Sequence, residues 1–311
     1  MTDLLKDQLE KTKNRKESYS SLSLLKQCPY KYFLKYIKGN YCSTSSIALE
    51  IGNICHKVME LKESEKLPFN KLTEILTKGY HSTEENLKGI REIKDFYFDD
   101  WLTVGRKSGI SYQDKINSFV ENRIRISDSL EWEIVATEKP FLIEVDGVKI
   151  TGKIDKVEKN SNGDYKITDY KTNDKVFDDK DLKTPLQMYI YALACNSLYG
   201  KFPVCFEYDF LLLNEKRQAM SKGWEKRGQT QLKKLLEERE AFYQAIEFAP
   251  NPTPLCYWCE MSQNSYIQGE TNGLCKYFSL WTPTNKSWEV NEKYIPFSCS
   301  EENEEFDDFD W

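Results

Sequence analysis

The chain has 311 residues, 40% of them hydrophobic and 14% aromatic, and this composition excludes a largely disordered protein. Seven of its 50 acidic residues lie in the last eleven positions, so residues 1–300 carry 43 acids against 44 bases and neither require nor exclude a nucleic-acid partner. The sequence has no apolar run of about 18 residues and no signal-peptide pattern, so we expect a cytoplasmic protein without a membrane span.

The N-terminal part is expected to be helical. Residues 1–18 are polar and predict a loosely attached helical segment. Ser20 or Ser21 is expected to cap the next helix, which should break near Cys28 because a proline follows it. Further helical stretches are expected over residues 51–65 and 70–126.

The middle of the chain predicts a series of strands. Alternating apolar residues, separated by turn signals such as Asp146–Gly147 and Asn162–Gly163, mark the strands. They cover residues 131–139, 141–145, 148–158 and 164–172, and a later strand begins at Val204. Helices are expected over 186–198 and 230–248. This order predicts an α/β fold with a mixed central sheet, a helical N-terminal part and a Cys-rich C-terminal part.

Acidic and basic residues on two adjacent strands suggest a metal site. Asp169 and Lys171 are two residues apart, so they share one face of a strand, and Asp155 lies on the preceding strand. Neighbouring carboxylates repel one another unless a cation such as Mg²⁺ neutralises them. The alternative is a charged surface hairpin, because Asp-x-Lys is common in a chain with 30% charged residues. The remaining lysines of the two strands are expected to be solvated or to face the backbone: Lys153, Lys156 and Lys166.

Three further polar residues lie on predicted helices. Gln187 and Tyr191 are four residues apart and share a helix face. His56 falls outside the apolar stripe of its helix, so it is expected at the edge of the core. A surface glutamine and a structural histidine are the alternatives.

Nine cysteines in a chain expected to be cytoplasmic argue against a disulfide framework. Cys256 and Cys259 form a CxxC pair, and Cys275 follows after fifteen intervening residues. Thiolates at this spacing suit zinc or an iron–sulfur cluster, with Cys28 as the candidate fourth ligand. The other cysteines are expected to be small buried apolar residues: Cys42, Cys55, Cys195, Cys205 and Cys299.

The ordered set of motifs resembles the RecB-like branch of the PD-(D/E)xK nucleases. The motifs are Gly52…His56, Gly152-x-x-Asp155, Asp169-Tyr-Lys171 and Gln187-x-x-x-Tyr191, and SLSLLKQCPYKYFLKYI is similar to the N-terminal segment of that branch. The resemblance spans residues 19 to about 280. One departure is Asp169, where many relatives carry glutamate.

The resemblance implies roles for these residues. It implies that His56, Asp155 and Asp169 bind Mg²⁺ or Mn²⁺ together with the backbone carbonyl of Tyr170. It further implies that Asp155, Asp169 and Lys171 are catalytic. Gln187 and Tyr191 would support the site and the DNA strand.

The cysteines resemble those of the iron–sulfur members of this branch, which include AddB-like and CRISPR-associated adaptation nucleases. These relatives hold a 4Fe-4S cluster with one cysteine before the nuclease core and three after it. The resemblance therefore implies a structural cluster, with Zn²⁺ as the alternative. The ligands would be Cys28, Cys256, Cys259 and Cys275.

We therefore expect a polar segment over 1–18, a nuclease domain over 19–290 and a disordered acidic tail over 291–311. The function implied is a metal-dependent DNA nuclease, an exonuclease on single-stranded ends acting in recombination, repair or DNA processing. The alternatives are a catalytically silent iron–sulfur DNA-binding or scaffold subunit and a zinc-stapled interaction protein. Residues 301–311, EENEEFDDFDW, resemble the acidic aromatic tails of single-stranded-DNA-binding proteins and suggest docking of a protein partner or autoinhibition.

Overall fold

The structure is a computed structural model with two compact units, which are described separately. Unit 1 comprises residues 1–46, 142–152 and 229–311, and unit 2 comprises 47–141 and 153–228. The described residues are 3–40, 47–64, 119, 131–173, 175–178, 182, 186–219, 222–245, 247–251, 253, 256, 259–261 and 274–275. The helices expected over 70–126 (Phe119 apart), the tail 291–311, Cys42 and Cys299 lie outside them.

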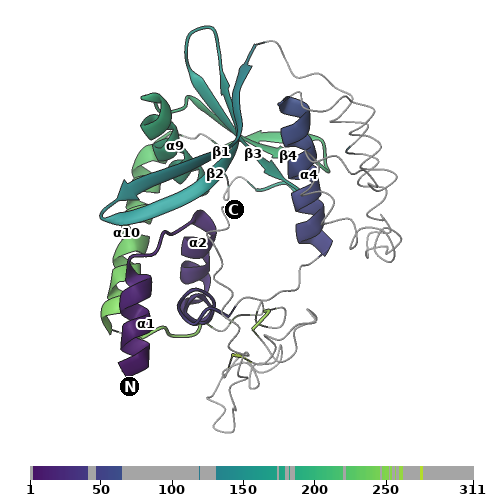
Figure 1. The fold of residues 1–311 in the computed structure, drawn as a ribbon. Helices are drawn as coiled ribbons and strands as arrows, with labels where there is room; N and C mark the ends of the chain where they lie inside the picture. The colour runs from purple at the N-terminus through teal and green to yellow at the C-terminus, as the bar shows by residue number, and fades with distance from the viewer. Residues whose placement is uncertain are drawn as a thin grey trace. The chain divides into compact units, whose positions relative to one another are not determined.

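The N-terminal part of unit 1 is helical, as predicted (Figure 1). Its elements are α1 (Asp3–Lys13), α2 (Tyr19–Gln27), α3 (Pro29–Tyr32) and the π-helix η1 (Phe33–Ile37), and it also contains most of α10 (Trp224–Ala245). The predicted break at Cys28 is confirmed, because this residue is extended between α2 and α3. The predicted cap is wrong, because Ser18 caps α2. Its hydroxyl accepts from the Ser21 amide, and the Ser21 hydroxyl accepts from the Ser18 amide, which satisfies two helix-end donors at once.

A buried glutamate holds the N-terminal segment in place. The Glu17 carboxylate is fully buried and accepts hydrogen bonds from Arg15 at 2.5 Å, Tyr32 at 2.6 Å and Arg239 at 2.8 Å. The Glu17 backbone also bridges to Ile150. The expectation of a loosely attached segment is therefore wrong.

The sheet has the strand order β1-β2-β3-β4-β5. Its strands are β1 (Glu133–Val145), β2 (Val148–Lys159), β3 (Tyr165–Lys171), β4 (Cys205–Phe210) and β5 (Glu215–Gln218). β3 pairs antiparallel with β2 and parallel with β4, and β4 pairs antiparallel with β5. The predicted mixed sheet is confirmed, whereas β5 was not expected from the sequence.

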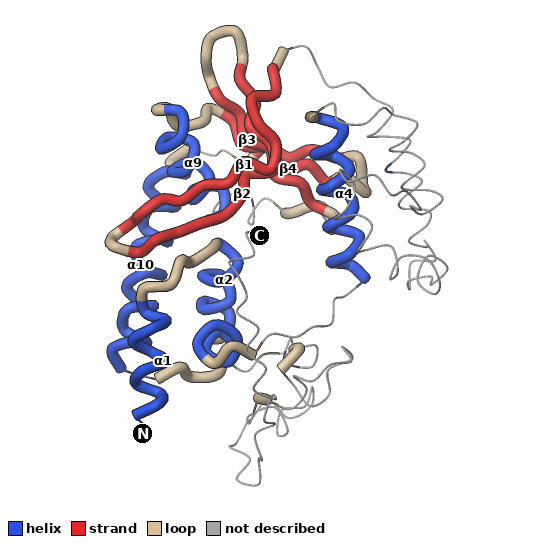
Figure 2. The backbone as a smooth tube through the Cα atoms, in the orientation of Figure 1, coloured by secondary structure: helices blue, strands red, loops and turns tan. Residues whose placement is uncertain are grey.

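The first hairpin differs from its prediction in one respect. The turn at Asp146–Gly147 is confirmed, and both residues have the positive φ, 50° and 78°, that a type I′ turn needs. β1, however, is one strand where two were predicted (Figure 2). The chain bends at Glu138, whose φ is 45°, and continues through Pro140 because an edge strand tolerates a missing backbone donor.

Two helices of unit 2 contact opposite faces of β3 (Figure 1). Successive side chains of a strand point to opposite faces. Gln187 of α9 (Leu186–Tyr199) bonds the side chains of Asp169 and Lys171, whereas Glu63 of α4 (Ile47–Glu63) accepts from the Tyr170 hydroxyl. The sheet is therefore covered on both sides where the predicted site residues lie.

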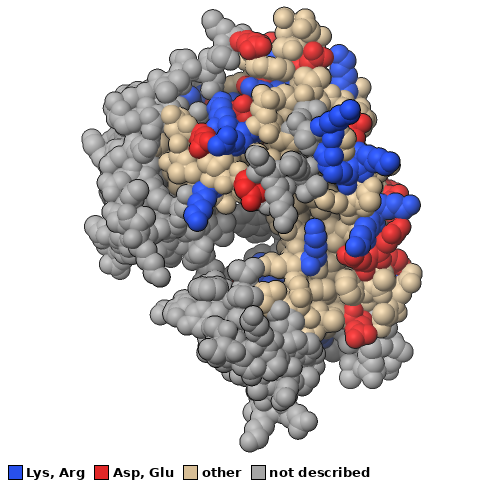
Figure 3. Space-filling view, turned by 180° about the vertical axis from the view of Figure 1, so that it is seen from behind, with Lys and Arg blue, Asp and Glu red and all other residues tan. Residues whose placement is uncertain are grey.

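The surface in view carries both signs of charge close together (Figure 3). On α10, Lys233 pairs with Glu237 at 4.0 Å and Lys234 with Glu238 at 3.7 Å. Exposed pairs of this kind stabilise a helix by only about 0.3–0.5 kcal/mol.

None of the described helices has both the length and the apolar character needed to cross a bilayer.

Candidate active site

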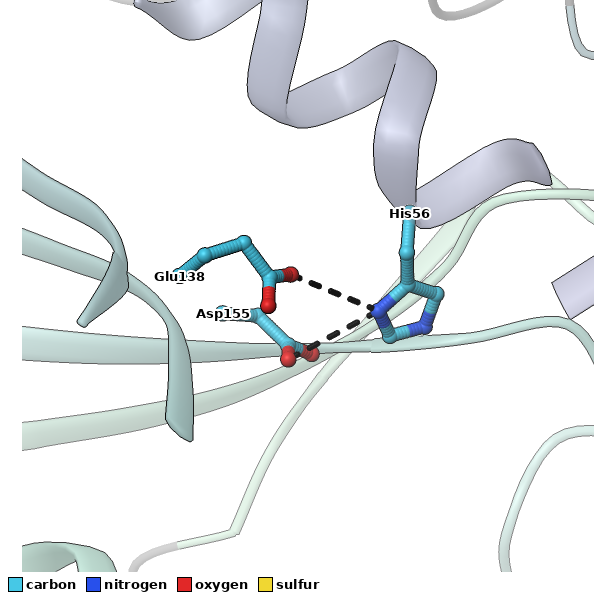
Figure 4. A group of neighbouring side chains, drawn as sticks. All are labelled: His56, Glu138 and Asp155. Carbon is cyan, nitrogen blue, oxygen red and sulfur yellow. Dashed lines mark ion pairs between the residues drawn. The ribbon is translucent and has the colours of Figure 1, made fainter. Parts of the chain in front are cut away.

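Three potential metal ligands converge in unit 2 from α4, β1 and β2 (Figure 4). The Nδ1 atom of His56 lies 3.6 Å from Oδ1 of Asp155 and 3.9 Å from Oε1 of Glu138. All three donor atoms lie within 4.8 Å of one another. Asp155 is buried, and the other two side chains are half-buried, so the group retains access to solvent.

A glycine lets α4 bring His56 close to the sheet. A Cβ atom added at Gly52, one helical turn before His56, would lie 3.3 Å from the Thr172 hydroxyl just beyond β3. The same helix buries Cys55, Val58 and Met59 completely. This packing anchors α4 and leaves His56 at the edge of the core, as the sequence predicted.

Asp169 and Lys171 form a second polar group with Gln187. The Lys171 ammonium lies 2.6 Å from Oδ2 of Asp169 and donates to Oε1 of Gln187 at 3.1 Å. The Gln187 amide donates to Oδ1 of Asp169 at 2.8 Å and to the Tyr191 hydroxyl at 3.0 Å. Gln187 therefore orients Asp169, Lys171 and Tyr191 together.

The pairing of β2 with β3 relates the two groups. Lys156 is opposite Thr168, so continuing this register by one residue places Asp155 opposite Asp169. Asp169 still lies outside the 4.8 Å ligand group, since its oxygens face Lys171 and Gln187. The Tyr170 amide donates to Oδ2 of Asp155 at 2.6 Å. Its carbonyl stays a predicted ligand.

The pKa values reflect burial first and neighbouring negative charge second. Burial and the charge of Asp155 raise the pKa of Glu138 to about 7. Burial raises the pKa of Asp169 to about 6, although Lys171 opposes the shift. Burial alone would lower the pKa of His56, but the Asp155 carboxylate raises it to about 9. Crowded acids with raised pKa values are typical of functional sites, where a cation can relieve the repulsion.

The donor set fits a hard divalent cation. Carboxylate oxygens suit Mg²⁺ and Mn²⁺, and imidazole suits transition ions. His56, Asp155 and Glu138 offer one nitrogen and two carboxylates on three elements that are packed together. The residues present therefore match the ligand chemistry of such an ion.

The affinity for Mn²⁺ is expected to rise with pH between about 6 and 9. Protons compete with the ion, because carboxylates must be ionised and His56 neutral before they can bind it. Glu138 and His56 lose their protons near pH 7 and 9. By mass action, each competing proton weakens binding by up to ~10-fold per pH unit below its pKa. Calorimetric titration across this range measures the slope, which should be shallower below pH 7 in Glu138→Gln. A flat profile would exclude these ligands.

Glu138 is a candidate ligand that the motif analysis missed. Glu138 and Asp155 lie equally far from the turn in sequence: Glu138 comes before Asp146 by the same number of residues as Asp155 comes after Gly147. A two-residue turn therefore places Glu138 opposite Asp155. The residue pairing that a two-residue turn implies was therefore a signal in the sequence for Glu138. It was not used because a strand break was predicted after residue 139.

Two lysines are not in the predicted environment. Lys156 is 1% exposed and Lys166 is 9% exposed, and both ammonium groups pair with carboxylates, so the expectation that they are solvated or face the backbone is wrong. Lys156 lies 3.0 Å from Glu63, and Lys166 lies 2.9 Å from Glu158. Both faces of β2 and β3 are covered, and the lysines are buried as ion pairs. Lys153 is half-buried.

The four predicted cluster cysteines are half-buried in unit 1. The Cys259 amide donates to the Cys256 carbonyl at 3.2 Å, and Cys259 and Cys275 pack against the apolar cluster of Leu34, Met261 and Leu274. Burial raises the pKa of Cys259, and Cys256 and Cys28 raise it further by charge. The Asn251 side chain donates to the Gln27 carbonyl at 2.9 Å, so the segment that leads to Cys256 lies beside the residue before Cys28. Within the described part of the chain, no three of these sulfurs lie within 4.8 Å of one another. Cys55 and Cys195 are buried as expected, and Cys205 is half-buried.

Comparison with known proteins agrees with the fold. A profile of the PD-(D/E)XK nuclease superfamily matches residues 16–263. Two proteins named as a subunit of an ATP-dependent helicase/deoxyribonuclease, from Streptococcus agalactiae serotypes Ia and V, are each 24% identical over 216 residues. The aligned region is 67% of this chain and 19% of each relative, so the chain spans about a fifth of their length.

Among solved structures, a provisionally assigned exonuclease from Eubacterium rectale is similar, with a TM-score of 0.46 and 11% identity. The match covers 83% of this chain and 91% of that one. The superfamily profile spans most of the chain and includes every predicted metal ligand and the Asp169–Lys171 pair. The chain therefore belongs to the PD-(D/E)XK nuclease superfamily.

Proposed function

We propose that this protein is a metal-dependent deoxyribonuclease that acts as an exonuclease on single-stranded DNA ends, in recombination, repair or DNA processing. The observation that carries the proposal is the convergence of His56, Asp155 and Glu138, together with the ion pair between the buried Asp169 and the half-buried Lys171. Two relatives are named as components of a helicase/deoxyribonuclease, which supports the choice of DNA.

The proposed roles follow from the contacts. His56, Asp155 and Glu138 would hold the ion, and Asp169 and the backbone carbonyl of Tyr170 are proposed as further ligands. A bound divalent cation would stabilise the negative charge that develops on the phosphate.

Lys171 reaches the same region and would orient or deprotonate the attacking water. Gln187 keeps Lys171 and Asp169 in place through hydrogen bonds to both, and Tyr191 supports Gln187. The Lys171 side chain is 20% exposed, so solvent can reach it.

End dependence tests the proposal. Linear single strands, circular single strands and linear duplexes, each labelled, should be incubated with Mn²⁺. We expect short products from the linear single strand and an intact circle, with no cleavage by Asp155→Ala. Equal cleavage of the circle would contradict an exonuclease, and preference for the duplex would contradict the strand choice. DNA binding without any cleavage would favour the catalytically silent alternative.

We further propose that Cys28, Cys256, Cys259 and Cys275 hold a structural 4Fe-4S cluster. The hydrogen bond from the Asn251 side chain to the Gln27 carbonyl, 2.9 Å long, brings the segment before Cys256 beside Cys28 and supports this set. Protein purified without oxygen should carry about four irons and absorb broadly in the visible range. Cys256→Ala should lose the iron, whereas Cys195→Ala, at a buried site in unit 2, should retain it. One tightly bound zinc and no iron would contradict the cluster.

The acidic aromatic tail is proposed to dock a protein partner or to compete with DNA. Its seven acids and three aromatic residues support this role. Deleting residues 301–311 should change DNA affinity or partner capture, and an unchanged result in both assays would contradict this role.

We expect the protein to act in the cytoplasm.

A further inference from the structure

A buried charged cluster lies on the face of the sheet that α4 contacts. It consists of Glu63, Lys156 and Tyr170, and we call it the Glu63 clamp. The Glu63 and Lys156 side chains are each 1% exposed and Tyr170 is 2% exposed. Oε1 of Glu63 lies 3.0 Å from the Lys156 ammonium and accepts a hydrogen bond from the Tyr170 hydroxyl. The clamp therefore ties α4 to both β2 and β3.

Tyr170 also contacts two of the candidate metal ligands. Its amide donates to Oδ2 of Asp155 at 2.6 Å, and its ring meets the His56 ring edge-on, with centroids 5.7 Å apart. Glu63 follows His56 by two helical turns on α4, so both can reach one strand. One residue is thus held at its hydroxyl end and touches ligands through its ring and amide.

Stability alone does not explain this arrangement. A buried ion pair is often replaceable by apolar residues without loss of stability, because removing the charges from water is costly. The ion pair here is joined to a third group, because the Tyr170 hydroxyl donates to the Glu63 carboxylate. The clamp fixes the position of the Tyr170 side chain beside His56 and Asp155.

We propose that the Glu63 clamp is a positioning device for the cation site: the Glu63–Tyr170 hydrogen bond sets the places of the His56 ring and the Asp155 carboxylate. The inference rests on the proposed function, because it takes these two residues as ligands. Glu63 and the Tyr170 side chain are positioning groups, since they act through His56 and Asp155. Partners behind metal ligands typically change metal affinity by 10–100-fold.

Mn²⁺ binding measured by calorimetry on the full chain without DNA tests the clamp. Tyr170→Phe removes only the hydroxyl and should weaken binding by about 10-fold. Tyr165→Phe is the matched control, because it removes a hydroxyl from the other end of β3 and should bind as the wild type does. Circular dichroism of each variant shows whether it is folded.

Variants of Glu63 keep the test decisive if Tyr170→Phe does not fold. Glu63→Gln retains an acceptor for the hydroxyl and should bind nearly as tightly as the wild type. Glu63→Leu removes this hydrogen bond together with the Lys156 ion pair, so it should be at least as weak as Tyr170→Phe. The double variant should be no weaker than Glu63→Leu, because the hydrogen bond is already absent there.

If folded Tyr170→Phe and Glu63→Leu bind Mn²⁺ as tightly as the wild type does, the clamp does not position the ligands, although the proposed metal site remains. A wild-type protein that binds no Mn²⁺ would instead overturn the metal centre, and the clamp with it.

Discussion

Replacing Lys171 by alanine is expected to lower the rate of DNA cleavage by about 10²–10⁴-fold, the usual contribution of a positioned acid or base. Its ammonium lies 2.6 Å from the buried Asp169 carboxylate and is held by Gln187. The substitution removes the group proposed to act on water. It also leaves Asp169 without the charge that opposes the rise of its pKa. Single-turnover cleavage with Mn²⁺ measures the effect.

The control is Lys159→Ala, which removes an exposed lysine at the end of β2. It should cleave at the wild-type rate, and both variants should bind single-stranded DNA, as followed by fluorescence anisotropy. Cleavage by Lys171→Ala at the wild-type rate would show that the catalytic lysine is assigned wrongly.

Asp155→Asn is expected to weaken Mn²⁺ binding by at least about 10-fold and to abolish measurable cleavage. Asparagine keeps the size of the side chain and an acceptor for the Tyr170 amide, so the local fold should persist. The substitution removes the negative charge of Asp155. This charge is needed for the proposed binding of the metal ion, and it also raises the pKa of His56. The pKa of His56 should therefore fall.

Proton NMR can follow that change, since His81 is the only other histidine in the chain and serves as an internal reference. Glu133→Gln, at an exposed position at the start of β1, is the matched control and should change neither metal binding nor the His56 titration. An unchanged His56 pKa in Asp155→Asn would contradict the contact itself.

Site features that depend on local spacing were predictable from the sequence. Asp169 and Lys171 share a strand face at a spacing of two, and Gln187 and Tyr191 share a helix face at a spacing of four. The structure joins all four through Gln187. These contacts lie within one element or between β3 and α9, whose described residues are only about fifteen positions apart in the chain.

Features that depend on tertiary packing were not predictable. Lys156 has the sequence context of a solvated strand lysine and is buried because α4 brings Glu63 against it. Glu138 joins the site because the first strand of the hairpin continues past an expected break and brings its carboxylate near Asp155. The choice of Ser18 as cap depended on a reciprocal bond with Ser21, which propensity alone does not distinguish from a cap at Ser20 or Ser21.

We propose that unit 2 holds a divalent cation at His56 and Asp155. Anomalous diffraction from Mn²⁺-soaked crystals of Lys171→Ala tests it most directly, because this variant keeps all proposed ligands. We predict one anomalous peak within coordination distance, about 2.0–2.3 Å, of His56, Asp155 and Glu138 or Asp169. Mn²⁺ bound only elsewhere on the chain, or none at saturating concentration, would contradict the account.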